Sequence, residues 1–165
     1  MKPALLVVDL QQRFFNESET TRRLLESAIQ YANASINLFR EKSLPIICIL
    51  HSDETLKPAD HDFDIPDALH ILPTDYRLVK THGNAFMEPD LLIHLKSLDV
   101  DSVIIVGFCA EYCVLSTYRG AEDHGLTPVI MRGGLASSKP ENIDFVENIS
   151  NIISYQALAK MLENC

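Results

Sequence analysis

Four short apolar runs constrain the fold of this 165-residue chain more than any other sequence feature. The runs are rich in valine and isoleucine and hardly alternate with polar residues; they cover residues 4–8, 45–50, 102–106 and 127–131, and a weaker run covers 151–154. Runs of this length and character are typical of strands that are buried on both faces of a parallel sheet. The sequence therefore predicts such a sheet.

Segments with helical periodicity lie between these runs. Apolar residues between positions 20 and 42 recur with a period close to 3.6, which predicts a long helix with one buried face. We expect shorter helices over residues 89–98, 113–123, 140–149 and 155–164. Strands that alternate with helices predict an α/β fold in which helices cover both faces of a mainly parallel sheet. We expect the whole chain, residues 1–165, to form one domain.

Residues 52–84 interrupt this alternation of predicted strands and helices. The segment holds three prolines, three histidines and several acidic residues, and it shows little periodicity. A long segment without regular structure inside a compact domain usually serves a function. We therefore expect a loop that covers the active site and contributes to substrate specificity.

Charge and composition exclude several classes of protein. The 14 basic and 23 acidic residues give a formal net charge of −9, which would repel a nucleic acid or an anionic membrane surface. No uncharged apolar stretch is long enough to span a membrane. The first residues do not have the pattern of a signal peptide, so we expect a cytoplasmic protein.

Polar and reactive side chains follow the predicted strands. Asp9 follows the first strand, His51 and Asp53 follow the second, and Cys109 and Cys113 follow the third. In open α/β sheets, ligands bind at the carboxyl ends of the strands. We expect these side chains to lie near one another at that edge of the sheet.

Cys113 is the main candidate nucleophile. It stands where a loop turns into a predicted helix, and the positive end of the helix dipole favours a thiolate there. Free N–H groups at the same helix end can bind a developing oxyanion. A buried structural cysteine is the alternative interpretation. Cys48 lies inside an apolar run, which indicates a core position, and Cys165 ends the chain.

Asp9 and Lys80 supply the other groups that a reactive thiol needs. A carboxylate at the end of an apolar strand needs a partner, although capping of the next turn would also account for Asp9. Lys80 taken alone reads as a solvated surface lysine. Together with Cys113, the two residues provide a nucleophile, a proton acceptor and a cation that stabilises both negative charges.

Three motifs resemble those of the isochorismatase-like cysteine hydrolases. Residues 9–14 resemble the D-x-Q-x-x-F signature of that family. Lys80 and Phe86 resemble its K-x-x-x-x-x-F segment, and residues 107–117 resemble its G-x-x-x-[DE]-x-C-V-x-x-T stretch. The motifs occur in the order and spacing of the family, and the similarity covers essentially the whole chain.

The resemblance implies a three-layer Rossmann-like fold and a Cys-Asp-Lys triad. Cys113 would be the nucleophile, Asp9 the proton acceptor and Lys80 the charge partner. The resemblance also implies a cis peptide bond between Phe108 and Cys109, with the backbone N–H groups of Cys109 and Cys113 facing the substrate oxygen. It further implies a small-molecule substrate and assembly as a homo-dimer or homo-tetramer.

Three side chains are candidates for the substrate pocket. Phe14 matches the pocket aromatic of the family, and an ordinary core position is the alternative. His51 is a polar group after the second strand, and Tyr112 neighbours the nucleophile. Arg132 could bind a substrate carboxylate or could be a surface arginine.

The sequence departs from the nicotinamidase branch of the family, which binds a metal through a D-x-H motif. The corresponding residues 53–55 read Asp-Glu-Thr, so the first histidine is missing. His51, Asp53, His61 and His70 form an alternative ligand set with irregular spacing, and we expect no metal. No glycine-rich phosphate motif is present, so we also expect no organic cofactor.

The cysteine at position 113 favours acyl transfer on an amide or ureide C–N bond through a covalent thioester. Three alternatives stay open. They are hydrolysis of a vinyl ether without covalent catalysis, a non-catalytic binding module on the same fold, and a redox protein that uses Cys109 and Cys113.

Overall fold

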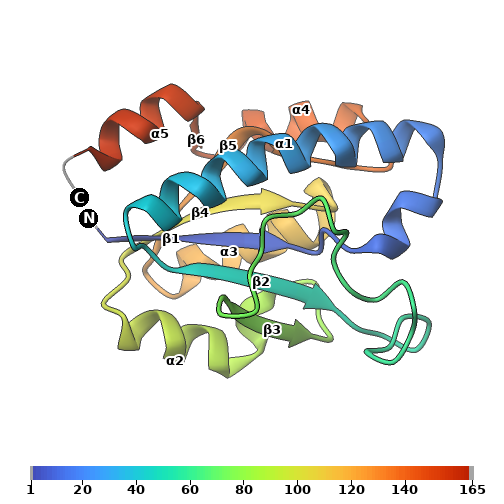
Figure 1. Ribbon diagram of the computed structural model, residues 1–165. Coiled ribbons are helices and arrows are strands. Elements are labelled where there is room, and N and C mark those ends of the chain that lie inside the picture. Colours follow the sequence, from blue (N-terminus) through green and yellow to red (C-terminus); the bar gives the residue numbers. More distant parts are fainter. Residues whose placement is uncertain (1, 164–165) are drawn as a thin grey trace.

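The computed structural model describes residues 2–163 (Figure 1). Its six strands form one parallel sheet: β1 (Pro3–Val8), β2 (Ile46–His51), β3 (Tyr76–Lys80), β4 (Ser102–Gly107), β5 (Thr127–Leu135) and β6 (Ile152–Ile153). The α-helices are α1 (Glu19–Glu41), α2 (Pro89–Ser97), α3 (Leu115–Asp123), α4 (Glu141–Asn148) and α5 (Tyr155–Leu162). Three short helical turns are η1 (Gln12–Asn16), η2 (Ala85–Met87) and η3 (Ala110–Val114). Across this part of the chain, no helix is both long and apolar enough to cross a membrane.

The order of the strands in the sheet determines where a ligand site is expected. The strands follow the order β3-β2-β1-β4-β5-β6, so that β1 lies between β2 and β4. The chain winds outward from β1 in one direction through β2 and β3, and in the other direction through β4, β5 and β6. In such doubly wound sheets, a crevice opens beyond the carboxyl ends of the two strands where the order reverses. Here those strands are β1 and β4.

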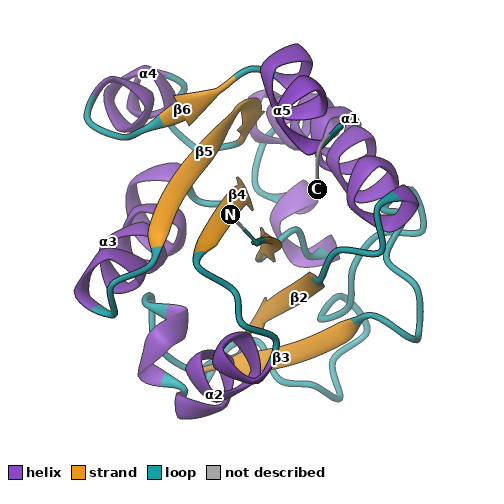
Figure 2. Ribbon diagram, turned by 90° about the vertical axis from the view of Figure 1, so that its left-hand side faces the viewer, coloured by secondary structure: helices purple, strands orange, loops and turns teal. Residues whose placement is uncertain are grey.

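Helices cover both faces of the sheet (Figure 2). Leu5 and Val7 of β1 belong to one buried cluster, to which α1 and α5 contribute, whereas Leu6 and Val8 belong to a second, to which α2, α3 and α4 contribute. Successive residues of a strand point to opposite faces, so both sets of β1 side chains are buried. The predicted α/β fold with helices on both faces is confirmed.

The long helix forms where the periodicity predicts it. Ser18 caps α1, because its side chain accepts a hydrogen bond from the Thr21 N–H at 3.0 Å. The apolar stripe buries Leu25, Ile36 and Phe39 completely against the sheet. Burial of this stripe fixes α1 across β1, β4 and β5.

The prediction that residues 52–84 lack regular structure is wrong for part of that segment. The strand β3 lies within it and pairs with β2 at the edge of the sheet. Only Leu78 and Lys80 of β3 are buried, so the strand has no continuous apolar run. The preceding residues 52–75 contain no helix or strand.

Several boundaries also differ from the prediction. The helix expected from position 113 begins earlier, with the π-helical turn η3, and β5 extends four residues further, through Gly133, whose φ is +80°. The strand expected over 151–154 is only Ile152–Ile153. The end of the last expected helix, at position 164, and Cys165 lie outside the described residues.

Candidate active site

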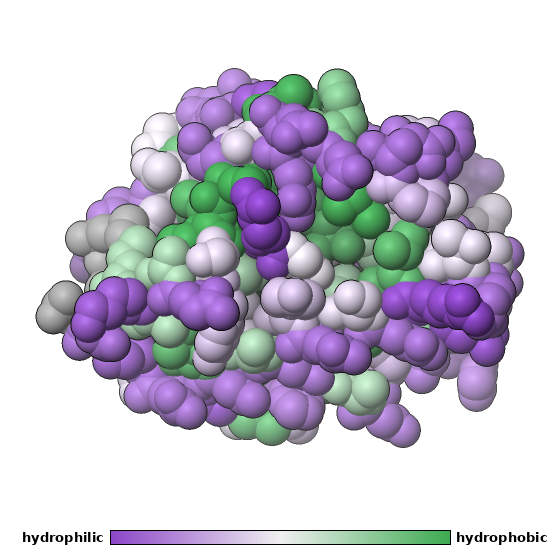
Figure 3. Space-filling model, turned by 90° about the horizontal axis from the view of Figure 1, so that it is seen from above, coloured by the Kyte–Doolittle hydropathy of each residue, from purple (hydrophilic) through white to green (hydrophobic). Residues whose placement is uncertain are grey.

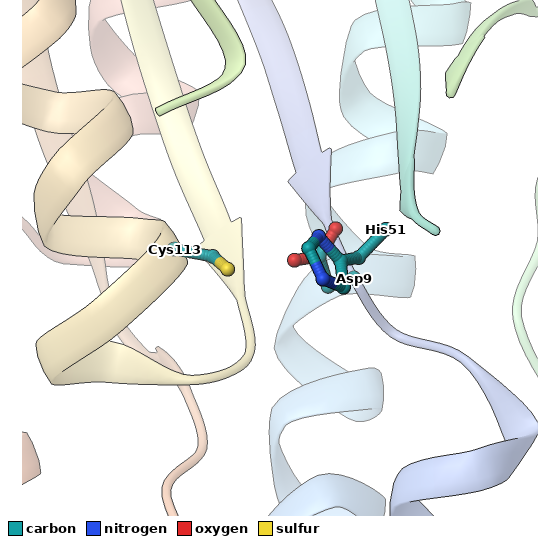
Figure 4. A group of neighbouring side chains, drawn as sticks. All are labelled: Asp9, His51 and Cys113. Carbon is teal, nitrogen blue, oxygen red and sulfur yellow. The ribbon is translucent and has the colours of Figure 1, made fainter. Parts of the chain in front are cut away.

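The carboxyl ends of the strands bring four chemically active side chains together. Asp9 directly follows β1, His51 and Lys80 are the last residues of β2 and β3, and Cys113 belongs to η3 after β4. His51 and Lys80 are paired in register, so the lysine emerges beside the histidine. Figure 4 shows the Cys113 side chain pointing towards Asp9 and His51.

Lys80 lies at the centre of this group. Its side chain is fully buried, and Nζ lies 2.8 Å from Asp9 Oδ2, 3.2 Å from His51 Nδ1 and 3.3 Å from Cys113 Sγ. An ammonium group has three donors and no acceptor, so each donor has one partner here. The lysine thereby connects the nucleophile candidate to the carboxylate.

The two carboxylate oxygens of Asp9 differ: one is paired with the Lys80 ammonium, and the other has no such partner. Burial raises the pKa of Asp9 above its ordinary value, against the opposing attraction of Lys80. Oδ2 accepts the Lys80 hydrogen bond, whereas Oδ1 is buried and, within residues 2–163, is hydrogen-bonded to no nitrogen or oxygen donor. A carboxylate oxygen of Asp9 and Sγ of Cys113 lie within 4.8 Å of each other. This arrangement suits a carboxylate that accepts a proton from the thiol.

Cys113 is a thiol in the free protein at neutral pH. Burial and the charge of Asp9 raise the pKa of Cys113 to about 12, against the stabilising effect of Lys80. Desolvation and the neighbouring carboxylate outweigh the attraction of Lys80, so the pKa of this thiol does not fall as the helix-end position predicted.

The loop before Cys113 has the expected backbone. The peptide bond between Phe108 and Cys109 is cis, as the resemblance implied. The Cys109 carbonyl accepts hydrogen bonds from Tyr112 N–H and Val114 N–H, and Ala110 N–H donates to a backbone carbonyl after β5. No acceptor in the described part of the chain takes the Cys109 N–H, which leaves it available to a ligand oxygen.

Cys109 and Cys113 direct their sulfurs into different hydrogen-bond networks. Sγ of Cys109 lies 3.0 Å from Glu111 Oε2 and 3.5 Å from Ser137 Oγ, whereas Sγ of Cys113 contacts Lys80. Burial raises the pKa of the Cys109 thiol to about 11, and both cysteines are free. These environments do not favour a redox pair.

His51 is held at its backbone and at both ring nitrogens. Because an ammonium only donates, His51 Nδ1 accepts from Lys80, and a neutral ring carries its proton on Nε2, which lies 3.4 Å from Asp53 Oδ2. Gln11 accepts from the His51 N–H at 2.8 Å and donates to the His51 carbonyl at 3.1 Å and to the Phe63 carbonyl at 2.7 Å. Gln11 is fully buried, and no role beyond its place in the D-x-Q motif was predicted for it.

The two aromatic pocket candidates differ in their surroundings. The Phe14 ring lies 4.6 Å from the ring of Phe108, so it packs beside the cis peptide bond. Tyr112 is 64% exposed, although it neighbours Cys113 in the chain. Phe14 therefore packs against the loop that carries the cis bond, whereas Tyr112 lies at the surface.

The structure separates the alternative metal ligands. His70 Nδ1 lies 3.4 Å from Asn37 Oδ1 of α1, and His61 is exposed. Within residues 2–163, the only cluster with metal-binding spacing is Asp9, His51 and Cys113. The Lys80 ammonium is hydrogen-bonded to all three, so it already holds the position that a shared cation would need.

Arg132 lies apart from this group. It lines a cavity of about 390 Å³ with residues of α1 and of the start of α5, namely Gln30, Tyr31, Ala34, Ser154, Tyr155 and Gln156. This face of the molecule shows interleaved polar and apolar residues (Figure 3). None of the side chains around Lys80 lines that cavity, so the structure does not support Arg132 as a ligand of the same substrate.

Comparisons with known proteins agree with this fold. Residues 3–151 match the isochorismatase domain family. The uncharacterized isochorismatase family protein YddQ of Bacillus subtilis is 25% identical over 143 residues, which cover 84% of this chain and 79% of that protein. A solved isochorismatase family protein has 26% identity and a TM-score of 0.80, with 92% of this chain and 98% of that chain covered. The N-carbamoylsarcosine amidase of Thermoplasma acidophilum shares the fold, with 22% identity, a TM-score of 0.81 and coverage of 94% and 97%.

Proposed function

This chain belongs to the isochorismatase family, and from that premise we propose that it hydrolyses a C–N bond of a small amide or ureide. Cys113 would act as the nucleophile, Asp9 as the proton acceptor and Lys80 as the charge partner. The observation that carries the proposal is the buried Lys80 ammonium, which is hydrogen-bonded to both Asp9 Oδ2 and Cys113 Sγ. A buried cation shared by a thiol and a carboxylate lowers the energy of the ion that forms when the proton moves between them.

In the first step, Asp9 takes the proton of Cys113 while Sγ attacks the substrate carbonyl carbon. A C–S bond forms, and the carbonyl π electrons move to the oxygen. The raised pKa of Asp9 suits this role, because a carboxylate of higher pKa is a stronger base. The N–H groups of Cys109 and Cys113 would donate to the oxyanion.

In the second step, the oxyanion collapses and the C–N bond breaks. Asp9 returns its proton to the leaving nitrogen, which leaves as ammonia or an amine. Water then attacks the thioester with Asp9 as the base, and the acid product leaves as the Cys113 thiol is restored. No organic cofactor takes part in this sequence.

Three further side chains would shape the pocket. Phe14 would pack against the apolar part of the substrate, since its ring lies behind the loop that carries the cis bond. His51 would hold Lys80 in position through Nδ1 and face the substrate with the rest of its ring. Tyr112 would cover the substrate from the exposed side.

The test is product release from nicotinamide, ureido acids, simple amides and isochorismate with wild type, Cys113→Ala and Cys48→Ala. We expect ammonia from an amide or ureide, a loss on the order of 10⁴-fold in Cys113→Ala, and activity retained in Cys48→Ala, because only Cys113 forms the thioester. Pyruvate release from isochorismate that survives Cys113→Ala would overturn the thioester mechanism. No turnover of any compound, with Cys113 no more reactive to alkylation than Cys48, would favour a binding module.

A further inference from the structure

Glu111 is a half-buried carboxylate that has no part in the proposed proton transfers. Its two oxygens accept three side-chain hydrogen bonds: Oε2 lies 3.0 Å from Cys109 Sγ and 2.8 Å from Ser137 Oγ, and Oε1 lies 2.6 Å from Asn142 Nδ2. Burial alone would raise the pKa of Glu111, but the hydrogen bonds from Cys109, Asn142 and Ser137 hold it below its ordinary value. The carboxylate is therefore a stable acceptor for all three donors.

The three donors come from separate parts of the fold. Cys109 follows the cis peptide bond, Ser137 follows β5, and Asn142 belongs to α4. Ser137 is fully buried and also accepts from the Lys139 N–H at 3.0 Å. Glu111 therefore links the loop before Cys113 to the segment after β5 and to α4.

The backbone of this loop is hydrogen-bonded at several points: Phe108 N–H donates to Val8 O, and the Cys109 carbonyl accepts from the N–H groups of Tyr112 and Val114. Ala110 N–H donates to Ala136 O, and Ala136 N–H donates to Gly107 O, which ties the loop to the end of β5 on one side. The polar contacts of the Cys109 sulfur within the described residues are with Glu111 and with Ser137 and Ser138, which follow β5. The Glu111 carboxylate therefore adds a restraint on the Cys109 side chain to those on its backbone.

We propose that Glu111, itself held by Asn142, is a positioning residue, which helps to fix the Cys109 N–H as an oxyanion donor by holding the Cys109 side chain beside Ser137. This inference rests on the proposed acyl transfer, because only that reaction forms an oxyanion. Glu111 contacts none of the triad side chains in the described structure, so its effect on catalysis is indirect.

Two reactions of Cys113 separate this role from nucleophile activation. Acylation by p-nitrophenyl acetate passes through a tetrahedral oxyanion, and release of p-nitrophenolate reports its rate. Alkylation by iodoacetamide displaces iodide from a saturated carbon and forms no oxyanion. The ratio of the two rates measures oxyanion stabilisation, and subtraction of the Cys113→Ala background isolates the nucleophile.

We expect Glu111→Ala to lower the acylation rate by about 10- to 100-fold and to leave Cys113 alkylation within about twofold, since a small displacement of an oxyanion donor has effects of that order. Glu141→Ala removes the same charge from the exposed start of α4 and should change neither rate. Equal acylation-to-alkylation ratios in Glu111→Ala and wild type would overturn the inference while the proposed function stands.

A double variant that exchanges the carboxylate and the amide of Glu111 and Asn142 distinguishes a positioning effect from loss of folding. Asn142→Asp places a second carboxylate beside Glu111, 2.6 Å from Oε1 in the present geometry, and should lower the rate ratio as Glu111→Ala does. In Glu111→Gln/Asn142→Asp, the new amide donates to the new carboxylate, and its oxygen still accepts from Cys109 and Ser137. We expect the ratio to recover to within about threefold of wild type, whereas failure to recover in a double variant of unchanged Tm would overturn the inference. Absence of Cys113-dependent acylation in the wild type would instead overturn the proposed function, and this inference with it.

Discussion

The Lys80 ammonium lies 2.8 Å from a carboxylate oxygen of Asp9, with both side chains buried, although the two residues are 71 positions apart in the chain. Asp9 follows β1 and Lys80 ends β3, so β2 separates their strands. The lysine spans that distance beside His51, its partner in the β2–β3 register. A buried ion pair of this kind costs stability if either charge is left alone, which makes it a sensitive point of the fold.

Lys80→Met should lower the free energy of unfolding by about 3–5 kcal/mol at pH 7, because it leaves the Asp9 carboxylate buried without a cation. Asp9→Asn/Lys80→Met removes both charges and should recover a large part of that loss. Urea unfolding of both variants gives the two values. Lys160→Met, which breaks the exposed pair with Glu163, is the control and should change stability by less than about 1 kcal/mol. A double variant less stable than Lys80→Met would contradict the interpretation.

Asp9→Asn should lower the pKa of the Cys113 thiol. In the wild type, burial and the Asp9 charge raise the pKa of Cys113 to about 12, and Lys80 opposes them. Removing the carboxylate charge leaves Lys80 as the nearest charge, so the thiolate becomes easier to form. We therefore expect alkylation of Cys113 by iodoacetamide at pH 8 to be faster in Asp9→Asn, while hydrolytic activity is lost with the base. The exposed Asp144→Asn should leave the alkylation rate unchanged; a slower rate in Asp9→Asn would refute the assigned cause.

The continuous apolar runs predicted the positions of β1, β2, β4 and β5, because strands covered on both faces need apolar residues at nearly every position. The edge strand β3 escaped prediction for a related reason. Its buried positions are Leu78 and Lys80, and the second of these is a lysine held by Asp9. Lys80, which the site requires, therefore interrupts the apolar pattern by which this strand could have been predicted.

The candidate site was predictable where side chains follow strand ends or match a family motif, as Asp9, Lys80 and Cys113 do. The structure brings these three together, and it also brings His51 against Lys80. The roles of Gln11 and Glu111 were not predictable. Their hydrogen-bond partners lie up to 52 and 31 positions away, and a single sequence carries no record of such pairs.

Gln11→Glu should destabilise the protein by about 2–4 kcal/mol. The fully buried Gln11 amide donates to two backbone carbonyls, those of His51 and Phe63, and a carboxylate cannot donate to either. The two carbonyls would then face a buried negative charge. Urea unfolding at pH 7 provides the measurement, with Gln12→Glu on the exposed neighbouring residue as the matched control. Equal stability of the two variants would show that the Gln11 bridge contributes little.

Cys48 should make stability depend on pH in the alkaline range. Burial raises the pKa of this thiol from an ordinary value of 9.0 to about 12, so above pH 9 the unfolded chain loses a proton that the folded protein keeps. Fewer bound protons in the unfolded state mean that stability falls as pH rises, by at most about 1.4 kcal/mol per pH unit for one thiol.

Cys48→Ala lacks this thiol, so ionisation at position 48 cannot lower its stability. The stability difference between wild type and Cys48→Ala, measured by urea unfolding at pH 7, 9 and 10, should therefore be constant up to about pH 8 and shrink above pH 9. Other groups that titrate in this range are present in both proteins and cancel in the difference. A difference that stays constant up to pH 10 would mean that the Cys48 thiol ionises in the folded protein as easily as in the unfolded chain.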